Sequence, residues 1–276
     1  MKSGIGMNSG IENRCTHTDT SADVRQLVNF LAEAVRPEKI FLLNSPVPDM
    51  AGDAAYVELL VVMPYRSHIL FREHQELVEF ANLRGRHVSC SLHRSDAVRE
   101  ALEQGHIFYS LSCTPCNLVY DDGSEPLPST PLELYPIIRE TALKTFRVRY
   151  GRGQAFYDCA RSCDNAAIIP FLLHQAAELT YRAILISLME KDTRTHSIKA
   201  LIRYSRRVAP QLSSVFPRDT PEEKQLVHLL DEAYLKSRYE PEYRFYTVTI
   251  DELFKRVKQL QEMVKQIFEE KVRLFE

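Results

Sequence analysis

The sequence has no excess of charge of one sign. Its 276 residues include 35 Lys and Arg and 37 Asp and Glu, which leaves a net charge of −2 at pH 7. A chain with this balance has no overall electrostatic attraction for nucleic acid or for an anionic membrane surface. A local basic cluster, Arg203, Arg206 and Arg207, falls on one predicted helix, and we interpret it as a solvated helix face.

Long apolar runs are also missing. No segment approaches the roughly 20 apolar residues that a bilayer-spanning helix needs, so we expect no membrane partner. Residues 1–20 are polar and rich in Gly, Ser and Thr, and they lack the apolar centre of a secretory signal. We therefore expect a flexible N-terminus over residues 1–20 and a cytoplasmic protein.

The six cysteines are too few for a disulfide scaffold in a chain of this length. Cys113 and Cys116 form a CxxC pair, but no second pair stands at the spacing of a zinc finger. Cys159 and Cys163, one helical turn apart, are spaced to complete a set of four ligands. A lone CxxC is weak evidence, so we interpret these residues as ordinary thiols and predict no metal site.

The front half of the chain alternates helical and strand patterns. Helical spacing of apolar residues or a C-terminal glycine predicts helices over residues 22–36, 67–83 and 96–104. Short apolar runs bounded by turn residues predict strands over residues 39–43, 56–63, 87–92, 107–111 and 117–120. This alternation predicts a small mixed-sheet α/β domain over residues 21–125.

The composition changes in a segment with four prolines, and we assign residues 126–135 as a linker. Beyond Tyr135 only residues 246–250 resemble a strand. A long helix over 166–189 and helices capped by Thr195, Thr220 and Thr249 follow, the last two within capping boxes. The pattern predicts an all-α bundle of four or five helices over residues 136–276.

Residues 40–45 and 56–62 resemble the nucleotidyltransferase superfamily related to DNA polymerase beta. That resemblance implies a Gly-Ser turn near the nucleotide phosphates and two acids, two residues apart on a strand, that hold Mg²⁺. Here Asn44 replaces the glycine before Ser45, Tyr56 replaces the first acid, and Glu58 stands at the second. The third acid, expected within residues 87–92, is absent.

A single carboxylate is a poor Mg²⁺ site. We therefore predict a degenerate domain, a pseudoenzyme that keeps the fold without the catalysis. The alternative is an active, Mg²⁺-dependent nucleotidyltransferase that adenylylates a small molecule or a protein. In that case Glu58 is the surviving catalytic metal ligand, and Asp53 is a weak candidate for the second acid.

Three segments of the rear half resemble the HEPN (higher eukaryote and prokaryote nucleotide-binding) domain. They are residues 167–178 (AIIPFLLHQAAE), 195–201 (THSIKAL) and 233–239 (AYLKSRY), and they occur in the order of the family. The resemblance implies a helical domain that pairs with a second copy, here a homodimer. Many HEPN proteins are ribonucleases with a His four to six residues after an Arg, but no His follows Arg238 at that spacing.

Binding of a nucleotide or RNA is the function that the sequence then predicts. His174, Glu178, His196, Arg238 and Tyr239 are the proposed binding residues of the helical part, together with Asn44 and Ser45 of the front half. Arg238 would hold a phosphate and Tyr239 would stack on a base. Two alternatives stay open: the polar groups fix the helix register, with His174 bonding a carbonyl and Glu178 pairing with Arg182 or Arg238, or the protein is a dimerisation scaffold.

Overall fold

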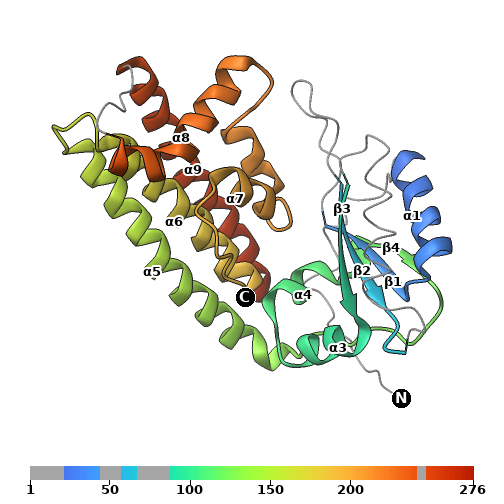
Figure 1. The fold of residues 1–276 in the computed structure, drawn as a ribbon. Helices are drawn as coiled ribbons and strands as arrows, with labels where there is room; N and C mark the ends of the chain where they lie inside the picture. The colour runs from blue at the N-terminus through green and yellow to red at the C-terminus, as the bar shows by residue number, and fades with distance from the viewer. Residues whose placement is uncertain (1–21, 44–56, 67–87, 241–246) are drawn as a thin grey trace.

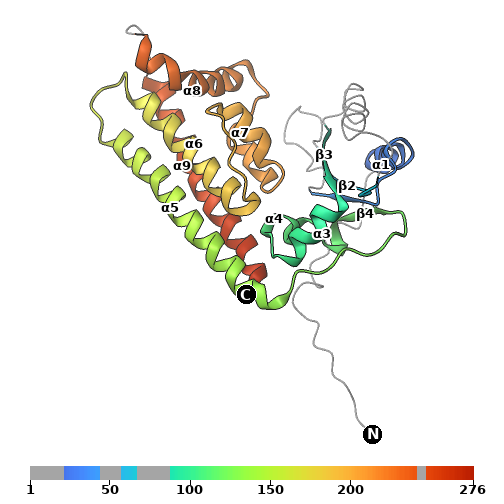
Figure 2. The same ribbon diagram turned by 60° about the horizontal axis from the view of Figure 1, so that its bottom comes forward.

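The computed structural model describes residues 22–43, 57–66, 88–240 and 247–276. A small sheet part comes first and a helical bundle follows, as the sequence predicts (Figure 1). In both views α3 (Ser95–Glu103) and α4 (Ile107–Ser112) lie between the sheet and the bundle (Figures 1 and 2). Helix α1 (Ala22–Val35) covers the opposite face of the sheet.

The sheet has four strands in the order β3-β2-β1-β4. Strand β1 (Lys39–Leu42) pairs antiparallel with both β2 (Val57–Met63) and β4 (Leu118–Asp121). Strand β3 (Val88–Arg94) pairs parallel with β2. The mixed sheet and these four predicted strands are therefore confirmed, whereas the helix predicted over residues 67–83 lies outside the described residues.

Strand β2 is buried on both of its faces, which explains its unbroken apolar run. Alternate side chains point to opposite sides of a strand. Leu59, Val61 and Met63 pack against α1. Leu60 and Val62 belong instead to a core that continues through α3 and α4 into the bundle.

Two strand predictions were wrong. Residues 107–111 form helix α4, in which Ile107, Phe108 and Ser112 are buried. A short apolar run fits a strand or a buried helical turn equally well, and here the backbone N–H of Phe108 donates to Nδ1 of His106 and starts a helix. Residues 246–250 likewise form no strand in the described part of the chain, because α9 begins at Thr247.

The bundle contains α5 (Tyr135–Arg161), α6 (Ile169–Met189), α7 (Ile198–Ser205), α8 (Pro221–Tyr239) and α9 (Thr247–Val272). Short 3₁₀ turns lie at Pro115–Asn117, Leu132–Leu134, Pro210–Val215 and Arg273–Phe275. Helix α6 is the central element and contacts the other four helices. Its buried residues include the polar His174, Glu178, Thr180 and Ser187.

One of the three predicted caps is confirmed and two are displaced. Thr220 forms a reciprocal capping box with Glu223 at the start of α8. Helix α7 is capped by Ser197, whose Oγ accepts from the N–H of Ala200, and the Thr195 hydroxyl accepts from the N–H of Ser197 instead. Thr249 lies inside α9, two residues after its first residue. Among the described residues, no helix combines the length and apolarity needed to cross a membrane.

Candidate functional site

A buried histidine anchors the polar cluster of the bundle. His174 on α6 is fully buried, and its Nε2–H donates to the carbonyl oxygen of His196 at 2.9 Å. The side-chain amide of Gln175 donates to Nδ1 of the same ring at 3.2 Å. Burial lowers the pKa of His174, which agrees with a neutral ring that donates through one nitrogen and accepts through the other. The prediction that His174 bonds a carbonyl is confirmed.

Glu178, one helical turn after His174, is buried with cationic and polar partners. Its Oε1 lies 3.0 Å from Nε of Arg182, and Nδ1–H of His196 donates to it at 3.1 Å. Arg182 also pairs with Asp192 at 2.6 Å and donates to the carbonyl oxygen of Thr195 at 2.8 Å. The cluster therefore holds the segment between α6 and α7 against α6, and Arg182 is the predicted partner of Glu178.

Next to this cluster, rings and a guanidinium group gather at the surface. The His196 ring stacks on Tyr234 at 4.3 Å between centroids and 10° between planes. The Arg238 guanidinium carbon lies 4.2 Å from the Tyr234 centroid and 5.2 Å from that of Tyr239. Side-chain exposure is 55% for His196, and Tyr239 is 72% exposed. We call His196, Tyr234, Arg238 and Tyr239 the Tyr234 patch.

The Tyr234 patch joins most of the predicted binding residues of the bundle. His174 and Glu178 lie beneath it and position His196, while Arg238 and Tyr239 extend it on α8. Tyr234, the central ring of the patch, was not among the predicted binding residues. The spacing contained the signal, because Tyr234 stands four residues before Arg238 and so lies on the same helix face.

Arg238 makes one side-chain hydrogen bond among the described residues. Its Nε donates to the carbonyl oxygen of Tyr234 at 2.7 Å. Within the described ranges no carboxylate lies within ion-pairing distance of it, whereas Arg182 has both Glu178 and Asp192. Arg238 is exposed, and an exposed arginine is suited to bind a phosphate or carboxylate group.

The front-half candidate, Glu58, is arranged differently. It lies on β2, is 1% exposed, and its Oε2 is 3.6 Å from Nε of Arg207, just beyond α7. Burial raises the pKa of Glu58 to about 7, although Arg207 and Ser89 favour the charged form. The expectation of a solvated face over Arg203, Arg206 and Arg207 is thus corrected: Arg207 is partly buried and bridges the two parts, and α7 ends before Arg206.

His93 lies on β3 opposite Val62 of β2. Its side chain is therefore on the same side of the sheet as that of Glu58. Its Nδ1 is 2.9 Å from the Tyr109 hydroxyl. Burial lowers its pKa to about 4, with Arg207, Lys191 and His106 acting in the same direction. The ring is therefore neutral at pH 7. Arg207 and His93 were both missed as partners of this region, because no sequence pattern links them to Glu58.

The described residues near Glu58 do not fit a Mg²⁺ ion. Its carboxylate faces a fixed cation, and a carboxyl with a pKa near 7 is only partly ionised at neutral pH. No three His, Cys, Asp or Glu side chains group as metal ligands in the part of the chain that the structure describes. Asn44, Ser45, Asp53 and Tyr56 lie outside the described residues.

Cys113 of the CxxC pair is a free thiol, whereas Cys116 is disulfide-bonded, so the interpretation as ordinary thiols is corrected for Cys116. Burial raises the pKa of Cys113 to about 12, which opposes the thiolate form that metal binding and redox chemistry need.

Comparison with known proteins identifies the helical part. The family model of the HEPN domain matches residues 160–270, so the chain contains a HEPN domain, as the sequence resemblance predicts. The match begins near the end of α5 and covers α6 to most of α9. No curated protein matched the chain. For the sheet part, the nucleotidyltransferase resemblance stays a prediction.

Proposed function

We propose that this protein binds a nucleotide or RNA through the Tyr234 patch of its HEPN domain, and that it acts in regulation without nucleotidyl transfer. The observation that supports this most directly is the solvent-exposed Arg238 beside three exposed or half-exposed rings. A guanidinium group binds phosphate oxygens in pairs, and the face of an aromatic ring stacks on a base. A nucleotide and an RNA each contain both a phosphate and a base.

The division of polar groups between interior and surface supports binding over a purely structural role. His174, Glu178 and Arg182 satisfy one another inside the bundle. Arg238 and Tyr239 are exposed residues, and among the described residues neither is hydrogen-bonded or ion-paired to His174, Glu178 or Arg182. A network that only fixes helix register has no need of an exposed arginine beside exposed rings.

The alternative function, Mg²⁺-dependent nucleotidyl transfer, is less well supported. It requires paired carboxylates around the ion, and Glu58 faces Arg207 instead of a second acid among the described residues. Pairing of two chains through the HEPN helices also belongs to the proposal. Its support is the exposure of the apolar Ile168 and Leu235, both within the matched residues 160–270.

Substitution of Arg238 tests the binding proposal. We expect Arg238→Ala to weaken binding of a labelled single-stranded RNA or of ATP by about tenfold or more, the equivalent of losing one contact of about 1–3 kcal/mol. Fluorescence anisotropy measures the RNA and thermal shift measures ATP, both without Mg²⁺, so the two ligand classes are distinguished.

Arg203→Ala is the matched control, because Arg203 also lies over a tyrosine ring, that of Tyr204, at 5.3 Å but outside the Tyr234 patch. Equal affinity of wild type and Arg238→Ala for both ligands would contradict the proposal. Transfer of labelled AMP in the presence of Mg²⁺, lost in Glu58→Ala, would support the alternative instead.

A further inference from the structure

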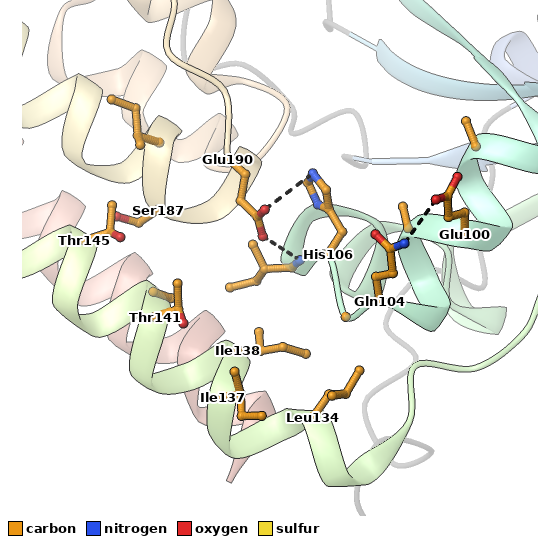
Figure 3. A pocket seen from close by; sticks show the side chains of 16 residues that line it. Glu100, Gln104, His106, Leu134, Ile137, Ile138, Thr141, Thr145, Ser187 and Glu190 are labelled. Atoms are coloured by element: carbon orange, nitrogen blue, oxygen red, sulfur yellow. Dashed lines mark hydrogen bonds and ion pairs between the residues drawn. The ribbon is translucent and has the colours of Figure 1, made fainter.

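A pocket lies where the sheet part meets the bundle (Figure 3), and its lining includes no residue of the Tyr234 patch. Its volume is about 490 Å³, within the range of roughly 300–1,000 Å³ typical of small-molecule sites. One wall comes from α3 and the turn that leads into α4, and the other comes from α5 and the last turn of α6. A ligand in this pocket contacts both parts of the chain.

The wall formed by the start of α5 is apolar. Leu134, Ile137 and Ile138 lie together there, opposite the α3–α4 turn (Figure 3). Ala101 and Ala142 add small apolar side chains to the lining. These side chains suit an aliphatic ligand body of a few carbon atoms, which gains free energy from leaving water.

The charged groups of the pocket are of one sign. Glu100 and Glu190 line it, and the lining includes neither Lys nor Arg. His106 is the one basic side chain in the lining; its Nε2 lies 3.9 Å from Oε2 of Glu190. The other oxygen of Glu190 accepts from the N–H of Ile107 at 3.3 Å. The pocket therefore favours a cation over a neutral or anionic ligand.

The end of α6 adds to this preference. Ile186, Ser187 and Glu190 line the pocket, so the carbonyl end of a 21-residue helix lies there. The last turn of α6 contains no basic residue, and Lys191, the next residue after Glu190, is not in the lining. The C-terminal end of a helix attracts positive charge. The pocket lining contains no permanently charged cation, that is, no Lys or Arg, to meet it.

A buried hydroxyl is the second sign of a ligand. Ser187 is 3% exposed and lines the pocket, and its Oγ has no hydrogen-bond partner among the described residues. Figure 3 shows Ser187 and Thr145 together at the end of the pocket between α5 and α6. Buried hydroxyls are normally hydrogen-bonded, and an ammonium N–H would donate to this oxygen.

We propose that this pocket binds an organic cation with an aliphatic body, namely an aliphatic amine. Glu190 and the end of α6 hold its ammonium group, Ser187 accepts a hydrogen bond, and the Ile137–Ile138 wall covers the carbon chain. This site is separate from the Tyr234 patch and does not depend on nucleotide or RNA binding there.

Three probes of equal chain length test the charge preference on the full chain. Isothermal titration calorimetry is carried out with hexane-1,6-diamine, hexane-1,6-diol and hexanedioate. We expect saturable binding at one site for the diamine and none for the diol or the dicarboxylate at the same concentrations. Equal binding of the diol would overturn the proposal, because Glu100 and Glu190 would then contribute nothing to binding.

Substitutions at two exposed positions of the lining locate the binding site. We expect Glu190→Gln to weaken diamine binding at least tenfold by removing the charge, and Thr141→Trp, at an exposed lining position, to abolish it by filling the pocket. Glu103→Gln is the control, because Glu103 is an exposed acid of α3 outside the lining. Diamine affinity within threefold of wild type in either lining variant would place the amine elsewhere and overturn the proposal.

Discussion

Glu58 and His93 lie on one side of two paired strands, and burial moves their pKa values in opposite directions. Between pH 4.5 and about 7 the folded chain keeps a proton on Glu58 that the unfolded chain has released. The free energy of unfolding therefore falls as pH rises through this window. Between about pH 4 and 6.5 His93 holds a proton in the unfolded chain and has lost it in the folded chain. The contribution of His93 to the free energy of unfolding therefore rises with pH in this window.

Glu58→Gln isolates the first contribution, since glutamine resembles the protonated acid. We expect the variant to match wild type near pH 4 and to exceed its free energy of unfolding by about 3 kcal/mol at pH 8. Urea unfolding followed by circular dichroism at both pH values measures the difference. Glu140→Gln, at an exposed position on α5, should show no such pH dependence. A Glu58→Gln variant less stable than wild type at pH 8 would mean that the ion pair with Arg207 outweighs the cost of burial.

At the scale of the elements, the approach of α5 to α6 depends on one glycine. A Cβ atom at Gly153 would lie 2.8 Å from Oγ1 of Thr180 and 3.2 Å from the carbonyl oxygen of Ala176. The Thr180 hydroxyl donates to that carbonyl at 2.6 Å, so making room for the Cβ atom would disturb this hydrogen bond. A Cβ atom added at Gly151, two residues earlier on α5, would meet nothing within 4 Å.

Alanine substitutions at the two glycines should therefore have opposite effects. Gly151→Ala should stabilise the chain by about 0.5–1 kcal/mol through helix propensity. Gly153→Ala gains the same propensity but overpacks the helix contact, for a net loss of about 1–2 kcal/mol. Melting temperatures of the two variants, compared with wild type, measure the difference. A stabilised Gly153→Ala variant would show that α5 shifts freely on α6.

Helices and strands are predictable from the sequence where the apolar pattern is long or a helix cap is complete. Strand β2 and helices α6 and α8 follow from apolar patterning and from the Thr220 capping box. Helix α4 was missed because six residues contain too little periodicity to separate a strand from a helix. Three of the four residues of the Tyr234 patch were predicted, but their contact with Tyr234 was not, because His196 lies on the segment between α6 and α7 and the others lie on α8. The contact of Arg207 with Glu58 depends on tertiary packing, for which a single sequence has no local signal.

For the whole molecule, the decisive feature is a core that crosses between the two parts. Leu60 and Val62 of β2, Val98 of α3 and Ile107 of α4 belong to one buried cluster with the residues of α6 and α9. The Glu58–Arg207 pair lies along the same junction. The boundary predicted at residues 126–135 therefore separates two segments of the sequence whose apolar interiors are continuous.

We expect the sheet part and the bundle to unfold together. Hydrogen exchange followed by mass spectrometry, at increasing urea below the unfolding midpoint, should give similar opening free energies for peptides of β2 and of α6, because loss of either exposes the shared core. Loss of protection in β2 at clearly lower urea than in α6 would contradict this expectation. Arg207→Ala should lower the protection of both peptides by similar amounts.

The buried contact between the two parts does not depend on an intact proline-containing connection between β4 and α5, because its residues lie on β2, α4 and α6. A protease that cuts this connection would divide the polypeptide without separating its halves, because the apolar surface that Leu60, Val62 and Ile107 share with α6 would still hold them as a nicked complex.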